Sequence, residues 1–421
     1  MGTRVLILAL FALAACKRQS EKYCGLHPGD LENCGYLDAM IDSRPTCGVD
    51  QDCSPGAPYC EMNAHFCVEC YSDTHCAANA EEKFCDLETF LCTSCRSNAD
   101  CMSEICLPNG VCGDDATVAY VDPIAGIDNA TCAQLTKCKT VEAALDTMKP
   151  YVKLQGTVSE EVVVSARAVT LIGEPGTTTL TRPMDGVVLT INMGSDVAIY
   201  DLYVVGKNEK GIVVDESTLR FVTSSVTECN RKDKRAIEAK MGSTLIMSRS
   251  SVYSNVGGGV VTDATTTFNI SNSFFYHNGA NDSMVGGLLL GAASSGLSRF
   301  EMNTVVDNRA ALTADAGGIA CTAAVPAPNN LIVRNLAGGL GSSPNSNKPA
   351  AGGCNLGMSL VDAAVDSFAF VSPDVTPYDY HVGPGSMAID RGVMSDIDID
   401  FDGGPRPFNN SFDVGADEYT P

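Results

Sequence analysis

A short pattern recurs along the second half of the chain, and this internal repeat restricts the fold more than any other feature. Each copy is a short apolar or β-branched run that ends in Asn, at residues 224–230, 250–255, 272–278, 303–308 and 330–335. The terminal Asn residues lie 25, 23, 30 and 27 residues apart. A unit this short cannot bury a hydrophobic face alone, so the period predicts stacked coils.

A second, Gly-rich phase follows each copy. It falls at residues 211–214, 236–239, 257–261, 286–290, 317–321 and 352–354. Helical periodicity is nearly absent from residue 150 onward, and the β-branched content indicates strands. Unequal periods with a short strand in each phase predict an all-β fold, a right-handed parallel β-helix whose equivalent residues stack about 4.8 Å apart. Roughly nine coils fit between residues 151 and 370, as a rod about 40 Å long.

The repeated Asn and paired Gly residues are interpreted as scaffolding rather than chemistry. We expect Asn230, Asn255 and Asn278 to lie in one column, in left-handed turn geometry, with amide hydrogen bonds to the next coil. The Gly-Gly pairs mark turns that enter a strand.

The entrance and the exit of the repeat region each resemble a known family. Residues 140–146 read as a short amphipathic helix with apolar positions 141, 144, 145 and 148, which would cap the first coil. This order resembles the N-terminal edge of extracellular β-helix proteins in the pectin-lyase-like superfamily. The motifs at residues 384–392, 398–407 and 413–419 resemble the closing module of the bacterial surface family called choice-of-anchor Q. That resemblance implies surface display and no particular reaction.

A cysteine framework precedes the repeat region. Twelve Cys fall between Cys47 and Cys112, a density typical of a disulfide scaffold. They form three sets of four: Cys47, Cys53, Cys60 and Cys67; Cys70, Cys76, Cys85 and Cys92; Cys95, Cys101, Cys106 and Cys112. Each set allows three pairings. Zinc is the alternative, because Cys67–Cys70 and Cys92–Cys95 are two CxxC pairs near zinc-ribbon spacing.

The remaining Cys suggest local bridges. Candidates are Cys24 with Cys34, Cys132 with Cys138, and Cys321 with Cys354. Cys321 and Cys354 fall in similar phases of successive coils. Once Cys16 is set aside, 19 Cys remain, and Cys229 is the candidate for a lone buried thiol.

The N-terminus resembles a bacterial lipoprotein signal. One Arg precedes an apolar run at residues 5–15, which is too short to span a bilayer and suits a signal peptide. The run ends Leu-Ala-Ala before Cys16, the expected lipidation site, which would be held in the membrane by its acyl chains. The Lys at position 17 favours an outer-membrane, surface-exposed location. The alternative is an ordinary signal peptide with an incidental Cys.

These features divide the chain into six segments. They are a signal peptide (1–15), a tether (16–46), disulfide repeats (47–113), an N-terminal cap (114–150), the β-helix (151–376) and a closing module (377–421).

Charge and hydropathy exclude two classes of protein. With 28 basic and 51 acidic residues the formal net charge is −23, which argues against nucleic acid as a partner. No apolar run reaches 18 residues, so no spanning helix is expected.

Three candidate sites remain. The nearest acid–base pair in the coils is Asp307 with Arg309, whereas glycoside hydrolysis needs two carboxylates at controlled separation. A basic loop of Arg231, Lys232, Lys234 and Arg235 is a candidate contact for an anionic polysaccharide, with a solvated loop as the alternative. Asp398, Asp400 and Asp402 match the start of an EF-hand-like calcium loop, but its twelfth position is Asn409 rather than Glu. A plain acidic turn is the alternative, and no cofactor is required.

The sequence therefore predicts a surface-exposed, lipid-anchored bacterial lipoprotein without catalytic activity. Its β-helix rod would serve adhesion, envelope structure or polysaccharide binding, with a polysaccharide or another surface protein as partner. The rival hypothesis is an extracellular polysaccharide lyase or glycoside hydrolase.

Overall fold

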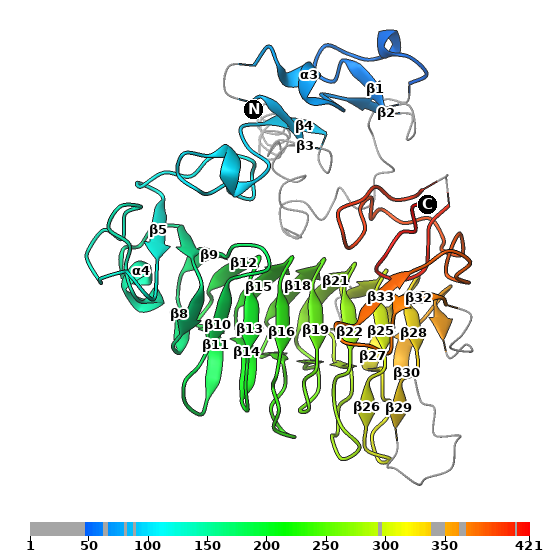
Figure 1. The fold of residues 1–421 in the computed structure, drawn as a ribbon. Helices are drawn as coiled ribbons and strands as arrows, with labels where there is room; N and C mark the ends of the chain where they lie inside the picture. The colour runs from blue at the N-terminus through cyan, green and yellow to red at the C-terminus, as the bar shows by residue number, and fades with distance from the viewer. Residues whose placement is uncertain are drawn as a thin grey trace, which may run out of the picture. The chain divides into compact units, whose positions relative to one another are not determined.

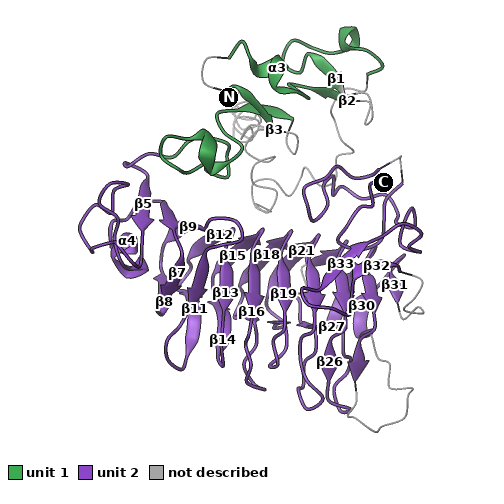
Figure 2. Ribbon diagram, viewed as in Figure 1, with its two compact units in different colours: residues 1–113 green, residues 114–421 purple. Residues whose placement is uncertain are grey.

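The chain forms two compact units, residues 1–113 and residues 114–421 (Figure 2). The structure, a computed structural model, describes residues 47–61, 66–79, 82–86, 90–293, 297–337, 350–361, 368–408 and 411–421. Disulfides organise the first unit, and stacked parallel strands organise the second.

Three parallel sheets build the second unit (Figure 1). Sheet 1 contains β5 (Val118–Val121), β6 (Tyr151–Leu154), β9 (Ala168–Ile172), β12 (Asp196–Tyr200), β15 (Thr218–Val222), β18 (Thr244–Ser248), β21 (Thr267–Ser271) and β24 (Arg299–Glu301). Sheet 2 contains β7 (Thr157–Ser159), β10 (Thr179–Thr181), β13 (Tyr203–Val205), β16 (Ser225–Thr227), β19 (Ser251–Tyr253), β22 (Phe274–Tyr276), β25 (Thr304–Val306), β28 (Leu331–Val333) and β31 (Leu360–Val361). Sheet 3 contains β8 (Val162–Ser165), β11 (Val187–Asn192), β14 (Lys210–Asp215), β17 (Ile237–Lys240), β20 (Val260–Thr262), β23 (Leu288–Leu290), β27 (Ile319–Pro326) and β30 (Ala350–Asn355).

The chain passes through the three sheets in turn, so each circuit is one coil of a β-helix. Seven coils, from β6–β7–β8 to β24–β25–β27, hold one strand of each sheet. The predicted fold class is confirmed: an all-β chain with a right-handed parallel β-helix, preceded by a small disulfide-rich domain. The prediction of roughly nine coils was too high for complete coils, since seven are complete among the described residues; sheet 2 reaches nine strands only because β28 and β31 belong to incomplete outer coils. Sheet 1 already begins at β5, inside the segment expected to be a cap.

Alternating side chains fill the interior of the coils. In sheet 1, Val197, Leu219, Leu245 and Phe268 occupy one register column, and all are fully buried. Their strands alternate buried and partly exposed positions, as strands with one solvated face should. Removal of apolar surface from water stabilises the stack by about 25 cal/mol per Å².

The predicted asparagine column exists, but one of its predicted members was wrong. The side chain of Asn255 donates to Asn278, Asn278 donates to Asn308, and Asn308 donates to Asn335. Asn230 is exposed, and the buried residue whose backbone N–H donates to Asn255 Oδ1 is its neighbour, Cys229. Counting from the Ser-Ser pair that starts each copy places Cys229 opposite Asn255, whereas matching the terminal Asn residues places Asn230 there.

The left-handed geometry also lies one residue earlier than predicted. Residues with positive φ stand directly before the column residues, at Ser254 (54°), His277 (53°), Asp307 (55°) and Arg334 (58°). The column residue turns inward and forms the inter-coil hydrogen bonds, while the residue before it turns the chain.

The predicted helix forms as α4 (Val141–Asp146). The Thr140 side chain accepts a hydrogen bond from the Ala143 N–H, which caps the first turn. Val141, Ala144 and Leu145 are buried as predicted. Met148 is 72% exposed with φ of 60°, because the helix ends before it.

Shorter elements complete the second unit. A parallel pair joins β26 (Arg309–Ala310) and β29 (Leu336–Ala337), and an antiparallel pair joins β32 (Phe370–Ser372) and β33 (Asp379–Val382). Buried residues of the closing module pack on the outer face of sheet 2, where Val414 and Ala416 share a core with Leu331 and Val333. None of the described helices is long and apolar enough to cross a membrane.

The first unit repeats one disulfide pattern three times. In every set the first Cys pairs with the third and the second with the fourth: Cys47–Cys60, Cys53–Cys67, Cys70–Cys85, Cys76–Cys92, Cys95–Cys106 and Cys101–Cys112. Its elements are η1 (Asp50–Asp52), β1 (Tyr59–Glu61), β2 (Phe66–Val68), α3 (Asp73–Cys76), β3 (Phe84–Asp86), β4 (Leu91–Thr93) and η2 (Asn98–Asp100). All four cysteines of the two CxxC pairs are bonded in disulfides, so they have no thiolate to offer a metal. The alternative of a zinc site there is wrong.

Candidate functional site

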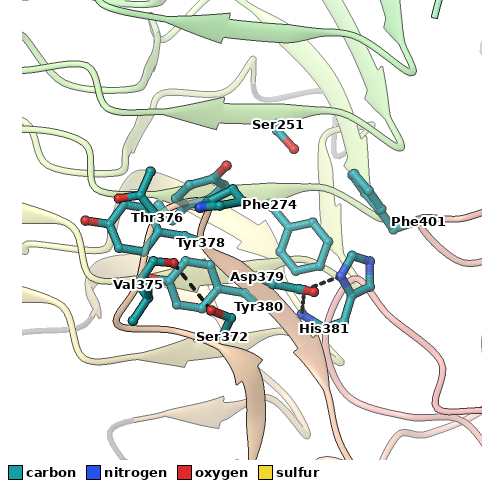
Figure 3. Close-up of a pocket in the computed structure, with 12 residues that line it drawn as sticks. Ser251, Phe274, Ser372, Val375, Thr376, Tyr378, Asp379, Tyr380, His381 and Phe401 are labelled. Atoms are coloured by element: carbon teal, nitrogen blue, oxygen red, sulfur yellow. Dashed lines mark hydrogen bonds and ion pairs between the residues drawn. The ribbon is translucent and has the colours of Figure 1, made fainter. Parts of the chain in front are cut away.

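A groove lined by aromatic rings opens where the closing module meets the outer face of sheet 2 (Figure 3). Its volume is about 560 Å³. Sheet 2 provides Ser251, Phe274 and Tyr276, because the residues that flank each buried strand centre point outward. The closing module provides residues 377–381 and Phe401, and the segment just before it provides Ser372, Val375 and Thr376.

The rings pack on one another in fixed geometry. Tyr276 stacks on Tyr253 of the preceding coil at 4.9 Å between centroids, and it lies 5.1 Å from Tyr380. Tyr378 packs 4.0 Å from the ring of His277. Contacts of this kind are worth about 0.5–1.5 kcal/mol beyond area burial, so the groove wall is preorganised.

A hydrogen-bonded network lies beneath the groove. The Tyr380 hydroxyl donates to Asp307 Oδ2 at 2.6 Å and lies 2.9 Å from His277 Nε2. Arg334 Nε donates to Asp307 Oδ1 at 2.7 Å. His277, Asp307 and Arg334 are the left-handed turn residues of three successive coils, so the stacking of the coils brings them together.

The surroundings of the network shift the pKa values of Tyr380 and His277. Burial, followed by the bond to Asp307, raises the pKa of Tyr380, and burial lowers the pKa of His277. Tyr380 is therefore a neutral donor. Arg309, the predicted partner of Asp307, lies in β26 with an exposed side chain and is not part of this network; Asp307 pairs with Arg334 instead.

A second cluster surrounds His381, in β33 at the groove edge. Its Nδ1 lies 2.6 Å from Asp379 Oδ1, and its Nε2 lies 3.4 Å from Asp402 Oδ2. Burial opposes the imidazolium, but Asp402 and Asp379 outweigh it and raise the pKa of His381 to about 9.

The predicted basic loop is largely engaged by the protein itself. Arg231 and Lys234 pair with the buried carboxylate of Glu209, at 2.7 Å and 2.9 Å, and the bond from Lys234 lowers the pKa of Glu209. Lys232 lies 3.3 Å from Asp282, and Arg235 donates to the carbonyl of Gly257. An anionic polysaccharide would have to compete with these partners.

The three predicted calcium ligands do not converge. Asp400 is buried, and its Oδ1 accepts from the N–H groups of Asp402 and Gly404. Asp402 faces His381, and Asp398 is exposed. This arrangement resembles the acidic-turn alternative. Asn409 lies outside the described residues.

The predictions for the cysteines of the second unit are confirmed. Cys132 is bonded to Cys138, and Cys321 to Cys354, while Cys229 is a free buried thiol, as the sequence indicated. The lipidation candidate Cys16, with Cys24 and Cys34, lies outside the described residues.

Sequence reasoning missed the groove altogether. Two signals could have found it. His277, Asp307 and Arg334 each stand one place before a column Asn, and the stretch 378–381 reads Tyr-Asp-Tyr-His in a chain with only 6% aromatic residues.

Comparison with known proteins adds little. No protein-family model matches the chain, and no curated protein is significantly similar to it. Among solved structures, the pectate lyase Pel9A is similar to this chain, with 14% identity and a TM-score of 0.45 over 72% of this chain and 96% of that one. A likeness this distant carries no argument about activity.

Proposed function

We propose that this chain is a surface-exposed bacterial lipoprotein of the choice-of-anchor Q type, and that its β-helix binds a polysaccharide without cleaving it. The observation that carries the binding role is the aromatic groove between sheet 2 and the closing module. Its rings are fixed by their neighbours, and side chains that need no rearrangement lose little entropy on binding.

The chemistry of the groove suits a sugar chain. A pyranose presents apolar C–H faces and a polar edge, so it packs on aromatic rings while its hydroxyls form hydrogen bonds. Tyr276, Tyr378 and Phe401 provide such faces, and Asp379, His381 and Ser251 provide polar groups beside them. Pockets of this composition, with apolar walls and few polar groups, are typical ligand sites.

The anchoring part of the proposal rests on the N-terminal sequence. The apolar run at residues 5–15 followed by Cys16 supports export and acylation. The disulfide repeats support an oxidising location outside the cytoplasm. Mass spectrometry of the mature N-terminus tests this part; an N-terminus other than an acylated Cys16 would contradict it.

Binding is tested by affinity electrophoresis against a panel of neutral and acidic polysaccharides. We expect retardation by at least one polymer, and about a fivefold to tenfold loss of affinity in Tyr378→Ala, as the loss of one stacked ring predicts. The matched control is Tyr200→Ala, which removes an outward tyrosine of sheet 1 that is not part of the groove lining. Equal retardation of both variants would contradict a binding role for the groove.

A polysaccharide lyase or glycoside hydrolase is the second candidate. One observation favours it: Asp307, Tyr380, His277 and Arg334 meet directly beneath the groove. An assay for unsaturated or reducing products on acidic polysaccharides distinguishes the two. Product formation that is abolished by Asp307→Asn would replace the non-catalytic proposal.

A further inference from the structure

Three side chains from separate segments of the closing module meet at one point. The ligand atoms of His381, Asp402 and Asp417 all lie within 4.8 Å of one another. His381 belongs to β33, Asp402 to the acidic turn, and Asp417 to the final residues of the chain. Two carboxylates and one imidazole are the donor types that bind divalent transition metals.

Neighbouring groups orient two of the three side chains. Asp379 Oδ1 lies 2.6 Å from His381 Nδ1, an arrangement that leaves Nε2 as the free ligand atom when the ring is neutral. The buried carboxylate of Asp417 accepts the Val382 N–H at Oδ2, at 2.8 Å. A carboxylate behind a histidine is the usual outer support of a metal-bound imidazole.

The inner face of the cluster contains an unsatisfied atom. His381 Nε2 is buried and makes no hydrogen bond among the described residues, although Asp402 Oδ2 lies 3.4 Å away. Two ligands of a tetrahedral zinc ion with bonds of about 2.0 Å are roughly 3.3 Å apart. The observed separation is therefore that of a metal-ligand edge, and is long for a hydrogen bond.

We propose that His381, Asp402 and Asp417 bind one divalent zinc ion at the edge of the aromatic groove. Three protein ligands leave one tetrahedral position for water or for an oxygen of a bound molecule. Solvent reaches the cluster, because the Asp402 side chain is 64% exposed. Calcium fits less well, since it takes six to eight oxygen ligands.

The proposal is tested by isothermal titration of the full, chelator-treated chain with zinc chloride. We expect one ion per chain, and at least a tenfold loss of affinity in Asp402→Asn and in His381→Gln. Asp379→Asn should weaken binding about tenfold through the orientation of His381. The matched control is Asp390→Asn, an exposed acid of the same module outside the ligand set, which should bind as the parent does.

Because Asp402 is largely exposed, its variant should fold even if the His381 variant does not. Absence of zinc binding by the parent chain, or unchanged affinity in Asp402→Asn, would overturn the proposal and leave the cluster as an ion-pair network. The titration contains no polysaccharide, so its result is independent of whether the groove binds one.

Discussion

The buried asparagines at the turns between sheets 2 and 3 support two coils at once. The Asn308 side chain donates to the carbonyls of Phe275 and Val306 and to Asn335, and its Oδ1 accepts the Asn278 N–H. Because the site is closed to water, each lost partner leaves a buried polar group unsatisfied at about 1–3 kcal/mol.

Asn308→Ala should therefore lower the free energy of unfolding by about 3 kcal/mol, as one orphaned N–H and an unfilled space add together. Urea denaturation followed by circular dichroism measures the change. Asn230→Ala is the control, since this exposed residue lies outside the column, and its effect should stay within about 0.5 kcal/mol. Similar losses in both variants would show that the column does not stabilise the fold.

The Asp263 carboxylate makes the free energy of unfolding of the second unit depend on pH. Partial burial disfavours its charged form, but bonds from the Met241 N–H and from Thr265 and Thr266 lower the pKa of Asp263 to about 2. A depressed folded-state pKa gives stability that is present above the unfolded value near 3.8 and is lost as pH falls through 2.

Between pH 4 and pH 2 the parent should therefore lose about 1 kcal/mol more stability than Asp263→Asn, after allowance for solvent screening. Denaturant titrations of both proteins at the two pH values give this difference. Other carboxylates titrate equally in both proteins, so a zero difference would remove Asp263 as a source of acid sensitivity.

At the scale of single elements, the repeat predicts the coils, whereas the groove depends on a contact between segments far apart in the sequence. The strands of sheet 2 follow from short apolar runs at a regular period, because each run has one inward residue and two outward ones. The assignment of Asn230 failed because Cys229 takes the inward place, and a small apolar side chain gives no periodic signal. The groove needs Tyr276 beside Tyr378, about a hundred residues later, and no local pattern records that contact.

Close approach of neighbouring coils restricts the glycines that begin sheet 3. A Cβ added to Gly286 would lie 1.8 Å from the carbonyl oxygen of Gly317, which is backbone and cannot move aside. Gly242 differs, because its φ is 79° and nothing lies within 4 Å of such an atom.

Gly286→Ala should therefore lower Tm by about 5 °C or more, or prevent folding, as an overpacked core position costs about 1–3 kcal/mol or more. Gly242→Asn should cost less than about 1 kcal/mol, because Asn tolerates left-handed geometry. Thermal melts of the two variants test the contrast, and a tolerated Ala at 286 would argue against tight packing between these coils.

For the whole molecule, the two units are stabilised by different forces. Among its described residues, the first unit buries mainly half-cystines, with only Val68, Ile105 and Leu107 as buried aliphatic side chains, so cross-links that restrict the unfolded chain supply most of its stability. The second unit has a continuous apolar core along the coils, and its bridges Cys132–Cys138 and Cys321–Cys354 only supplement that core.

Reduction should consequently unfold the first unit and spare the second. In calorimetry of the full chain we expect two transitions under oxidising conditions. With excess dithiothreitol one of them should disappear, while the β-helix transition moves down by up to about 10 °C, because opening the Cys321–Cys354 and Cys132–Cys138 loops together removes about 6 kcal/mol at most. Limited proteolysis of the reduced protein should cut within residues 47–113 and leave a resistant fragment that starts near Asp114, where the second unit begins. If both transitions vanished together on reduction, the apolar core would be too weak to hold the coils alone.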